Sequence, residues 1–322
     1  MTLNEFLAEW HNDNPRILVH TSGSTGKPKP LMVEKRRMLN SARITCDFLG
    51  LKPGDTALLC MPLDYIAGKM MVVRSLQRDL RLTSVRPSSH PLADDALPHF
   101  TFAAMVPMQV YNTLKVPCER ERLMHIRHLI IGGGAISDEL AQMIKPLPNA
   151  VWSTYGMTET LSHIALRRLN GPDASLWYTP FDGVGISLNA DGCLVIDAPE
   201  VCAEPLVTND IAQLRTDDRT GKTLFRIKGR KDNVVCSGGI KIQIEEVEET
   251  LRPHLSEPFM IVKRQDEMLG EKAILLTESA DLTHIEEICR NTLPKYWVPR
   301  EFLHIDHLPL TETGKPKRSG AF

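Results

Sequence analysis

The feature that most constrains the fold is an alternation of short apolar segments with amphipathic stretches in the first half of the chain. The stretches Lys35–Leu49 and Ser137–Lys145 have the apolar spacing of helices, and Ser137 is a suitable N-cap. The apolar segments predicted to be buried strands are Ile17–His20, Ala57–Cys60, Leu80–Val85, Thr101–Met105, His128–Ile131 and Val151–Thr154. Such strand–helix alternation predicts an α/β fold with a mainly parallel sheet.

The pattern changes after Gly171, where short strand-like segments are joined by turns. These segments, which predict a small antiparallel sheet or barrel, are Gly183–Leu188, Cys193–Asp197, Val207–Leu214 and Leu224–Lys228. The charged stretch Lys228–Asp232 follows and is predicted to be a linker.

An α+β tail comes after this linker. Its predicted strands are Phe259–Val262 and Ala273–Leu276, and Ile244–Leu251 is a predicted helix. Thr283 and Glu286 have the spacing of a capping box for a second helix. A chain of 322 residues suits two unequal domains. We therefore expect a large N-terminal domain over 1–229, a hinge near 230–232, and a small mobile C-terminal domain over 233–322.

Composition excludes several classes of protein. Lys and Arg number 38 and Asp and Glu 40, so a net charge of −2 gives no electrostatic signal for nucleic acid or an anionic membrane. No apolar run reaches the roughly 18 residues that a spanning helix needs. The N-terminus lacks the pattern of a signal peptide.

Cysteine and histidine spacing argues against disulfides and metal centres. The seven cysteines form no CxxC pair, which predicts neither a disulfide framework nor a zinc site and favours a reducing cytoplasm. The HxxH pairs, His125 with His128 and His304 with His307, have no completing ligands nearby in the sequence and are interpreted as structural.

The segment His20–Pro30 follows a predicted strand and combines glycines, hydroxyl side chains and lysines, as a phosphate-binding loop requires. It is not the P-loop of NTPases, because Thr21 and Pro28 stand where that motif needs glycine and a hydroxyl residue. The residues expected to hold phosphate are Thr21, Ser22, Gly23, Ser24, Thr25, Gly26 and Lys27.

Two further segments carry chemistry. Ser153–Thr160 follows another predicted strand; Tyr155 offers an aromatic face for a base, and Thr158 and Glu159 offer the oxygen ligands that Mg²⁺ prefers. Near the C-terminus, Leu308–Lys317 places Lys315 directly after a glycine, where it can project as a point charge.

In this order the three segments resemble the adenylate-forming superfamily of acyl-CoA synthetases, adenylation domains and luciferases. Other segments that resemble the superfamily are Met61–Gly68, Gly133–Ala135, Thr208–Asp210, Gly229–Asp232 and Pro309–Lys315. The resemblance implies a gate at Tyr65, an adenine-lining stretch of Gly133, Gly134 and Ala135, and nucleotide contacts from Tyr155 and Gly156. It also implies ribose contacts from Asp210 and Arg230, and a hinge at Asp232.

The resemblance implies ATP, Mg²⁺ and coenzyme A as reactants. A carboxylate attacks the α-phosphorus of ATP, pyrophosphate leaves, and the thiol of CoA then attacks the acyl-adenylate and releases AMP. Glu159 would bind the metal and Thr158 would bind the α-phosphate. Lys315 would stabilise the negative charge that develops during adenylation. Gly238 and Gly239 would form a pantetheine channel after the small domain swings.

The segment Val235–Val247 resembles the o-succinylbenzoate–CoA ligases of menaquinone biosynthesis. The second carboxylate of that acid needs a cation or several donors if it is buried. The polar residues that flank the Tyr155–Glu159 segment, and are therefore the nearest candidates for this role by sequence, are Ser153, Thr154, Ser162 and His163. The alternatives are another aryl- or acyl-CoA synthetase, a phosphotransferase that cleaves between the β- and γ-phosphates, and a non-catalytic binding remnant.

Two departures from the superfamily pattern stand out. Asn209 replaces a glycine, and asparagine is expected to tolerate the left-handed backbone of a turn there. The phosphate loop begins at residue 21, so we expect part of the usual first subdomain, and one wall of the acyl pocket, to be missing. The expected partners are a small carboxylic acid, ATP and CoA, with neither nucleic acid nor membrane contact, in a cytoplasmic monomer or homodimer.

Overall fold

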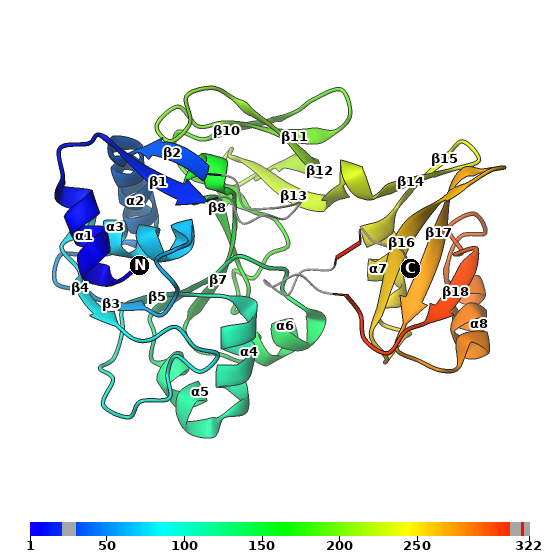
Figure 1. Cartoon of the computed structure of the whole chain (residues 1–322), viewed down its shortest axis with the longest axis horizontal. Helices are drawn as coiled ribbons and strands as arrows, with labels where there is room; N and C mark the ends of the chain where they lie inside the picture. The colour runs from blue at the N-terminus through cyan, green and yellow to red at the C-terminus, as the bar shows by residue number, and fades with distance from the viewer. Residues whose placement is uncertain (21–29, 310–316, 319–322) are drawn as a thin grey trace. The chain divides into compact units, whose positions relative to one another are not determined.

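The computed structural model describes residues 1–20, 30–309 and 317–318 (Figure 1). Residue contacts divide the chain into two compact units. The large unit comprises residues 1–186, 196–206 and 215–225, and the small unit comprises 187–195, 207–214 and 226–322. The hinge expected near 230–232 stays a prediction.

A seven-stranded sheet forms the centre of the large unit, in the order β4-β3-β5-β6-β7-β8-β9. Its strands are β3 (Thr56–Leu59), β4 (Arg81–Ser84), β5 (Phe102–Met105), β6 (His128–Ile131), β7 (Ala150–Gly156), β8 (His163–Arg168) and β9 (Thr179–Pro180). The pairs from β4 to β7 are parallel, whereas β8 and β9 are antiparallel. The predicted α/β fold with a mainly parallel sheet is confirmed.

The helices of the large unit follow the predicted amphipathic pattern. In α2 (Lys35–Leu49), Ala42, Cys46 and Leu49 of the expected apolar face are buried, but Leu39, expected on the same face, is 37% exposed and Met38 is buried instead. The helix ends at Gly50, whose φ is +65°. The predicted cap Ser137 accepts a hydrogen bond of 3.2 Å from the backbone N–H of Leu140. The other helices are α1 (Leu3–His11), α3 (Ile66–Arg78), α4 (Pro107–Lys115), α5 (Pro117–Met124) and α6 (Asp138–Ile144).

The chain also contains two smaller sheets. The strands β1 (Arg16–His20) and β2 (Pro30–Glu34) form an antiparallel pair on either side of residues 21–29. A second sheet contains β10 (Gly185–Leu188), β11 (Cys193–Asp197), β12 (Leu206–Thr216) and β13 (Thr223–Arg230) in sequence order. Its strands match the short segments predicted after Gly171.

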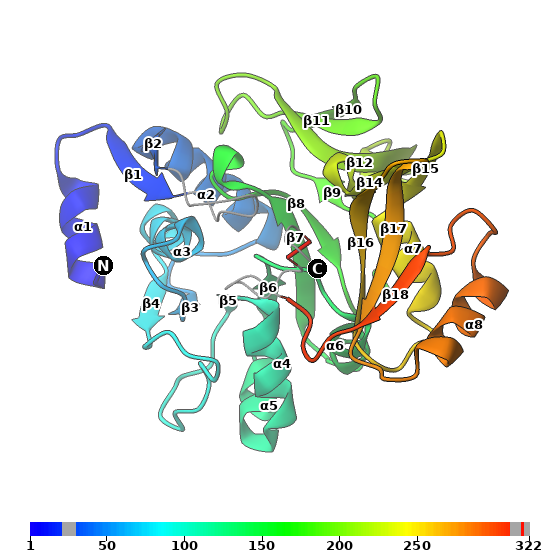
Figure 2. The same cartoon turned by 45° about the vertical axis from the view of Figure 1, so that its right-hand side comes forward.

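The small unit contains a five-stranded sheet in which β15-β14-β17-β16 are neighbours and β18 pairs with β17 (Figure 2). Its elements are β14 (Val234–Ser237), β15 (Ile240–Gln243), α7 (Ile244–Leu251), β16 (Phe259–Asp266), β17 (Gly270–Thr277), α8 (Leu282–Thr292) and β18 (Glu301–His304). Side chains of α7 and α8, including Val247, Leu251 and Ile285, pack with strand residues such as Val235 and Ile261 in one core.

Two local expectations were wrong. The cap of α8 is Asp281, whose carboxylate accepts from the N–H of His284 at 3.0 Å; Thr283 lies inside the helix and Glu286 pairs with Arg290. A carboxylate two residues earlier captures the free N–H groups first, so the helix begins sooner than the Thr–Glu spacing indicates. Asn209 lies in the extended strand β12 and has no positive φ, so its replacement of glycine involves no left-handed turn.

All seven cysteines are free thiols. Among residues 1–20, 30–309 and 317–318, no helix has both the length and the apolar character needed to cross a membrane.

Candidate active site

Several residues proposed from the sequence follow the carboxyl ends of parallel strands of the central sheet, where α/β folds place their ligands. Tyr65 stands at the start of α3, after β3, with 43% of its surface exposed. Gly133, Gly134 and Ala135 follow β6, and the φ of Gly133 is +81°. The segment from Tyr155 to Thr160 lies at the end of β7. The topology therefore brings these three segments to one edge of the sheet.

The turn after β7 is fixed by Thr160, a residue that the sequence reasoning missed. Its buried hydroxyl accepts from the N–H of Met157 at 3.0 Å and lies 2.9 Å from the Met157 carbonyl and 2.7 Å from the Ser162 carbonyl. This hydroxyl ties both ends of the short 3₁₀ turn η1 (Thr158–Thr160) together. Within that turn Thr158 is buried and Glu159 is exposed.

Gly156 permits a close approach between β7 and the start of β8. A Cβ atom at this position would lie 2.3 Å from the carbonyl oxygen of Ser162 and 2.4 Å from the Cα of His163. The pairing register of the two strands shifts between Tyr155 and Gly156. Any side chain here would therefore push apart the strands that frame Thr158 and Glu159.

Tyr155 belongs to an aromatic cluster. Its ring lies 5.8 Å from that of Tyr178 and 5.0 Å from that of Phe225, between centroids. The hydroxyl of Ser153 lies 3.0 Å from the hydroxyl of Tyr178. Ser153 thus bonds to this cluster, and it is not hydrogen-bonded to His163.

A buried chain of hydrogen bonds joins α3, β8 and α2. Arg74 on α3 donates to the hydroxyl of Ser162 at 2.5 Å, and this hydroxyl lies 3.2 Å from Nδ1 of His163. Nε2 of His163 lies 3.1 Å from the hydroxyl of Thr45, which itself donates to the backbone carbonyl of Ser41 at 3.1 Å. Because Thr45 uses its proton on that carbonyl, it must accept from His163, which places the imidazole proton on Nε2. Nδ1 then accepts the proton of Ser162.

Burial and the nearby positive charge of Arg74 hold the pKa of His163 well below its ordinary value, so the imidazole is neutral. Burial also lowers the pKa of Arg74 to about 10, which leaves its guanidinium charged near neutral pH. Arg74 is only 2% exposed, and its Nε has no hydrogen-bond partner. Within the part of the chain that the structure describes, Arg74 forms no ion pair with a carboxylate.

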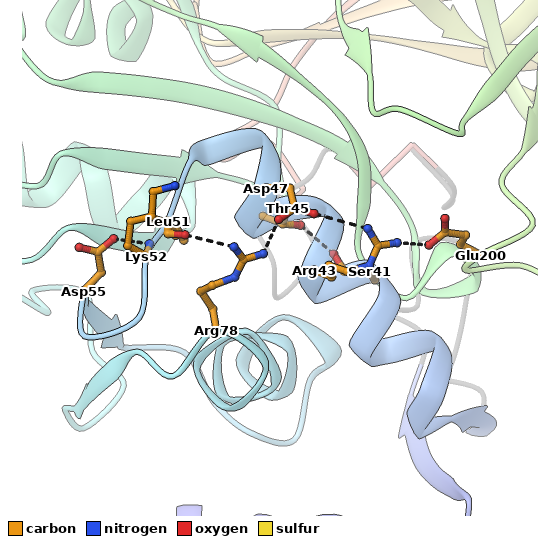
Figure 3. Close-up of polar contacts among 9 residues, drawn as sticks. All are labelled: Ser41, Arg43, Thr45, Asp47, Leu51, Lys52, Asp55, Arg78 and Glu200. Atoms are coloured by element: carbon orange, nitrogen blue, oxygen red, sulfur yellow. Dashed lines mark hydrogen bonds and ion pairs between the residues drawn. The ribbon is translucent and has the colours of Figure 1, made fainter.

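Partly exposed ion pairs connect α2 to α3 and to the segment after β11 (Figure 3). Asp47 of α2 pairs with Arg78 of α3, and Arg78 also donates to the carbonyl of Leu51 at 3.3 Å. Arg43 of α2 pairs with Glu200 after β11. These ion pairs link α2 to α3 and to the segment after β11 without involving the side chains of Thr45 or Arg74.

The expected ribose and hinge residues lie together in the small unit. Arg230 is 3.6 Å from a carboxylate oxygen of Asp210 and donates to Asp232 at 3.2 Å. The side-chain amide of Asn209 also donates to Asp232, at 3.2 Å. Asn209 thus uses its side chain on the expected hinge residue, which the glycine of the superfamily pattern cannot do.

Gly238 and Gly239 have a structural role of their own. They are the central residues of the two-residue turn between β14 and β15, in which Ser237 pairs with Ile240. Their φ values are +56° and +83°, as a type I′ hairpin turn requires. The N–H of Gly238 donates to the carbonyl of Leu269 at 2.9 Å, which joins this turn to the β16–β17 hairpin.

The expected phosphate-loop residues and Lys315 lie outside the described residues, which omit 21–29 and 310–316. Among the residues that are described, no three His, Cys, Asp or Glu side chains gather as a metal site would require. His125 and His304 each bond a backbone carbonyl through Nδ1, at 2.9 and 3.0 Å.

Comparison with known proteins agrees with this geometry. The profile of the family described as "AMP-binding enzyme" matches residues 4–203. The chain belongs to the AMP-binding enzyme family. It is 34% identical to an acyl-CoA synthetase (AMP-forming)/AMP-acid ligase II-like protein from Dyadobacter fermentans, whose crystal structure superposes with a TM-score of 0.68 over 98% of this chain and 91% of that one.

Other relatives carry more specific names. A 2-succinylbenzoate–CoA ligase from Bacillus mycoides is 26% identical over 337 aligned positions, which cover 95% of this chain and 69% of that protein. The O-succinylbenzoate coenzyme A synthetase of Bacillus subtilis, solved in complex with ATP and magnesium ion, is 23% identical, with a TM-score of 0.73 over 94% of this chain and 68% of that one. At that identity the likeness shows the shared fold.

As a member of the AMP-binding family, the chain is an AMP-forming acid–CoA ligase that uses ATP, Mg²⁺ and CoA. This identification excludes the phosphotransferase alternative. A single exposed carboxylate, Glu159, fits a Mg²⁺ ion that is held mainly by substrate phosphates and water, because Mg²⁺ in such sites takes one or two protein carboxylates.

Proposed function

We propose that this ligase activates o-succinylbenzoate and transfers the acyl group to coenzyme A. The observation that carries the proposal is Arg74, a fully buried guanidinium with no carboxylate partner among the described residues. It lies against Ser162, three residues after Glu159. The names of the 2-succinylbenzoate–CoA ligases among its relatives support the same substrate.

The charge of Arg74 explains why a dicarboxylate suits this site. A buried cation without an anion is costly, and an ionised carboxylate that reaches it regains much of that free energy. Of the two carboxylates of o-succinylbenzoate, one reacts with ATP and the other needs such a partner. Ser162 and His163, which were expected from the sequence to serve the second carboxylate, both lie in the hydrogen-bonded chain with Arg74.

Ser162 is the member of that chain that a substrate meets, because its side chain is only partly buried whereas Arg74 and His163 are buried. Its oxygen already accepts from Arg74, so its proton is the group that can turn from His163 to a carboxylate. We therefore assign the second carboxylate to Ser162, with Arg74 supplying positive potential behind it.

The remaining roles follow the family resemblance. The reacting carboxylate attacks the α-phosphorus of ATP, and pyrophosphate leaves. Thr158 binds the α-phosphate, Glu159 is the protein ligand for Mg²⁺, and Lys315 stabilises the charge that builds on the α-phosphate oxygens. When bound, Mg²⁺ neutralises charge on the phosphates of ATP. The residues assigned to the phosphates of ATP are Thr21–Lys27, and those assigned to adenosine are Gly133–Ala135, Tyr155, Gly156, Asp210 and Arg230.

After adenylation, Asp232 is assigned as the hinge and Gly238 with Gly239 as the CoA-binding turn. Tyr65 is the proposed gate to the acyl site, and Ser153 supports the cluster around Tyr155. His163 keeps Ser162 oriented through its neutral Nδ1 atom.

The test is pyrophosphate release with CoA present, over o-succinylbenzoate, benzoate, a coumarate-like acid and a medium-chain fatty acid. We expect the dicarboxylate to be preferred by about 10²-fold or more, because an acid without the second carboxylate leaves the buried donors unpaired. Arg74→Met should abolish that preference while leaving benzoate turnover less changed. Arg78→Met is the matched control on the same helix, because Arg78 pairs with Asp47 instead.

Two outcomes would refute the assignment. Equal or better use of the fatty acid by the unaltered enzyme would identify another acyl-CoA synthetase. An unchanged dicarboxylate preference in a folded Arg74→Met variant would show that the second carboxylate binds elsewhere.

A further inference from the structure

Arg318, close to the C-terminus, is held firmly in the small unit. Its guanidinium donates to both carboxylate oxygens of Glu248 on α7, at 2.6 and 2.8 Å, and to the backbone carbonyl of Ile261 on β16, at 2.5 Å. Glu248 also accepts from the N–H of Ile261 at 2.7 Å. The side chains of Arg318 and Glu248 are only 17% and 9% exposed. Such a bidentate, sheltered pair fixes the geometry of its two side chains more tightly than an exposed ion pair does.

The chain is also fixed where it enters and leaves the segment 310–316. The N–H of Leu308 donates to the carboxylate of Glu278 at 2.9 Å. The N–H of Lys317 donates to the carbonyl of Pro309, also at 2.9 Å. This hydrogen bond joins the two described residues on either side of 310–316, the stretch of sequence that contains Lys315, and the next residue is Arg318.

We propose that Arg318 and Glu248 are positioning residues for adenylation. Their ion pair holds the chain to α7 and β16 at Arg318, three residues after the lysine in the sequence. The inference rests on the role proposed above for Lys315. It goes beyond that role by assigning Arg318 and Glu248 as the residues that limit where the chain next to the lysine can lie.

Loss of the ion pair between Arg318 and Glu248 should lower the rate of adenylation and leave thioester formation nearly unchanged. Lys315 acts while pyrophosphate leaves, and a displacement of about 1 Å in a group that must meet a transition state can lower the rate about 10²-fold. Thioester formation from an acyl-adenylate does not use this lysine in the proposed scheme. A purely structural role for Arg318 would instead lower both half-reactions together.

Two substitutions and a matched control test the idea. Arg318→Met removes the ion pair, and Arg318→Lys keeps the charge but not the bidentate geometry. Lys272→Met is the control, because Lys272 is 18% exposed and makes an equally short ion pair of 2.6 Å, to Glu301 in the same unit. Each variant is measured for acid-dependent ATP–pyrophosphate exchange, for thioester formation from supplied acyl-adenylate, and for melting temperature.

We expect Arg318→Met to lower the exchange rate by between about 10-fold and 100-fold while thioester formation changes by less than about threefold. Arg318→Lys should recover part of the exchange rate, and Lys272→Met should leave the ratio of the two rates unchanged. An equal loss in both half-reactions, or the same split in Lys272→Met, would overturn the proposal.

Lys315→Ala separates failure of this inference from failure of the proposed function. If Lys315→Ala abolishes exchange but Arg318→Met leaves it intact, the ion pair is not needed and only this inference fails. If Lys315→Ala leaves exchange intact, the role proposed for the lysine is wrong and this inference falls with it, whereas the substrate assignment is judged separately by Arg74→Met.

Discussion

Replacing Gly156 by alanine tests whether the turn after β7 is built on the close approach of two backbones. The added Cβ would lie 2.3 Å from the carbonyl oxygen of Ser162 and 2.4 Å from the Cα of His163. Carbon and oxygen atoms pack at about 3.5 Å, so the backbones must separate by about 1 Å. Both contacts are with backbone atoms, which cannot rotate away as a side chain can.

Overpacking of this kind costs about 1–3 kcal/mol. For a domain of this size each kcal/mol lowers the melting temperature by about 2–4 °C. The effect on adenylation should be larger than the effect on stability, because Thr158 and Glu159 follow within three residues. A displacement of about 1 Å at these groups should lower acid-dependent ATP–pyrophosphate exchange by about 10²-fold.

The control is Gly185→Ala, whose added Cβ would lie 3.5 Å from the Cβ of Asp197, an ordinary contact. Exchange rate and melting temperature are measured for both variants beside the unaltered enzyme. A Gly156→Ala enzyme that keeps the normal exchange rate and melting temperature would show that the two strands have room to part, and the steric argument would be wrong.

Three further predictions concern other residues. Lys315→Ala should lower acyl-adenylate formation by about 10²–10³-fold but spare thioester formation from supplied acyl-adenylate, as half-reaction assays would reveal. Asp232→Pro restricts the backbone at the expected hinge, so adenylation should survive and thioester formation collapse; normal rates for both steps would place the hinge elsewhere. Burial lowers the pKa of His128 from 6.5 to about 4, so the folded state resists protonation and loses stability as the pH falls from 6.5 towards 4. Between pH 7 and pH 5 the melting temperature of His128→Leu should therefore fall less than that of the unaltered enzyme. An equal fall in both proteins would contradict the argument.

Much of the fold could be predicted from the sequence because the strands are short, apolar and separated by amphipathic helices. The strand predicted at Val151–Thr154 lies within β7, and the helix predicted at Lys35–Leu49 has those bounds in the structure. The cap of α8 was misassigned because several nearby polar side chains could cap, and only packing decides which one does.

The sequence revealed less about the site, since its members are far apart along the chain. Arg74 interrupts an apolar helical stretch, which was a usable signal, but its contact with Ser162 spans 88 positions. Gly156 matched a nucleotide-binding pattern, whereas the need for glycine there arises from β8. The neighbours of Asn209 resemble a turn motif and so predict a turn, whereas its hydrogen bond goes to Asp232, in a 3₁₀ turn 23 residues further along the chain.

The two glycines of the β14–β15 turn limit which substitutions these positions can accept during evolution. Both residues need positive φ, which few amino acids other than glycine and asparagine accept. Selection for the hairpin alone would therefore keep Gly238 and Gly239 even if the thiol acceptor changed from free CoA to a carrier-bound pantetheine. Descendants of this chain could exchange one acceptor for another while this stretch of sequence remained the same.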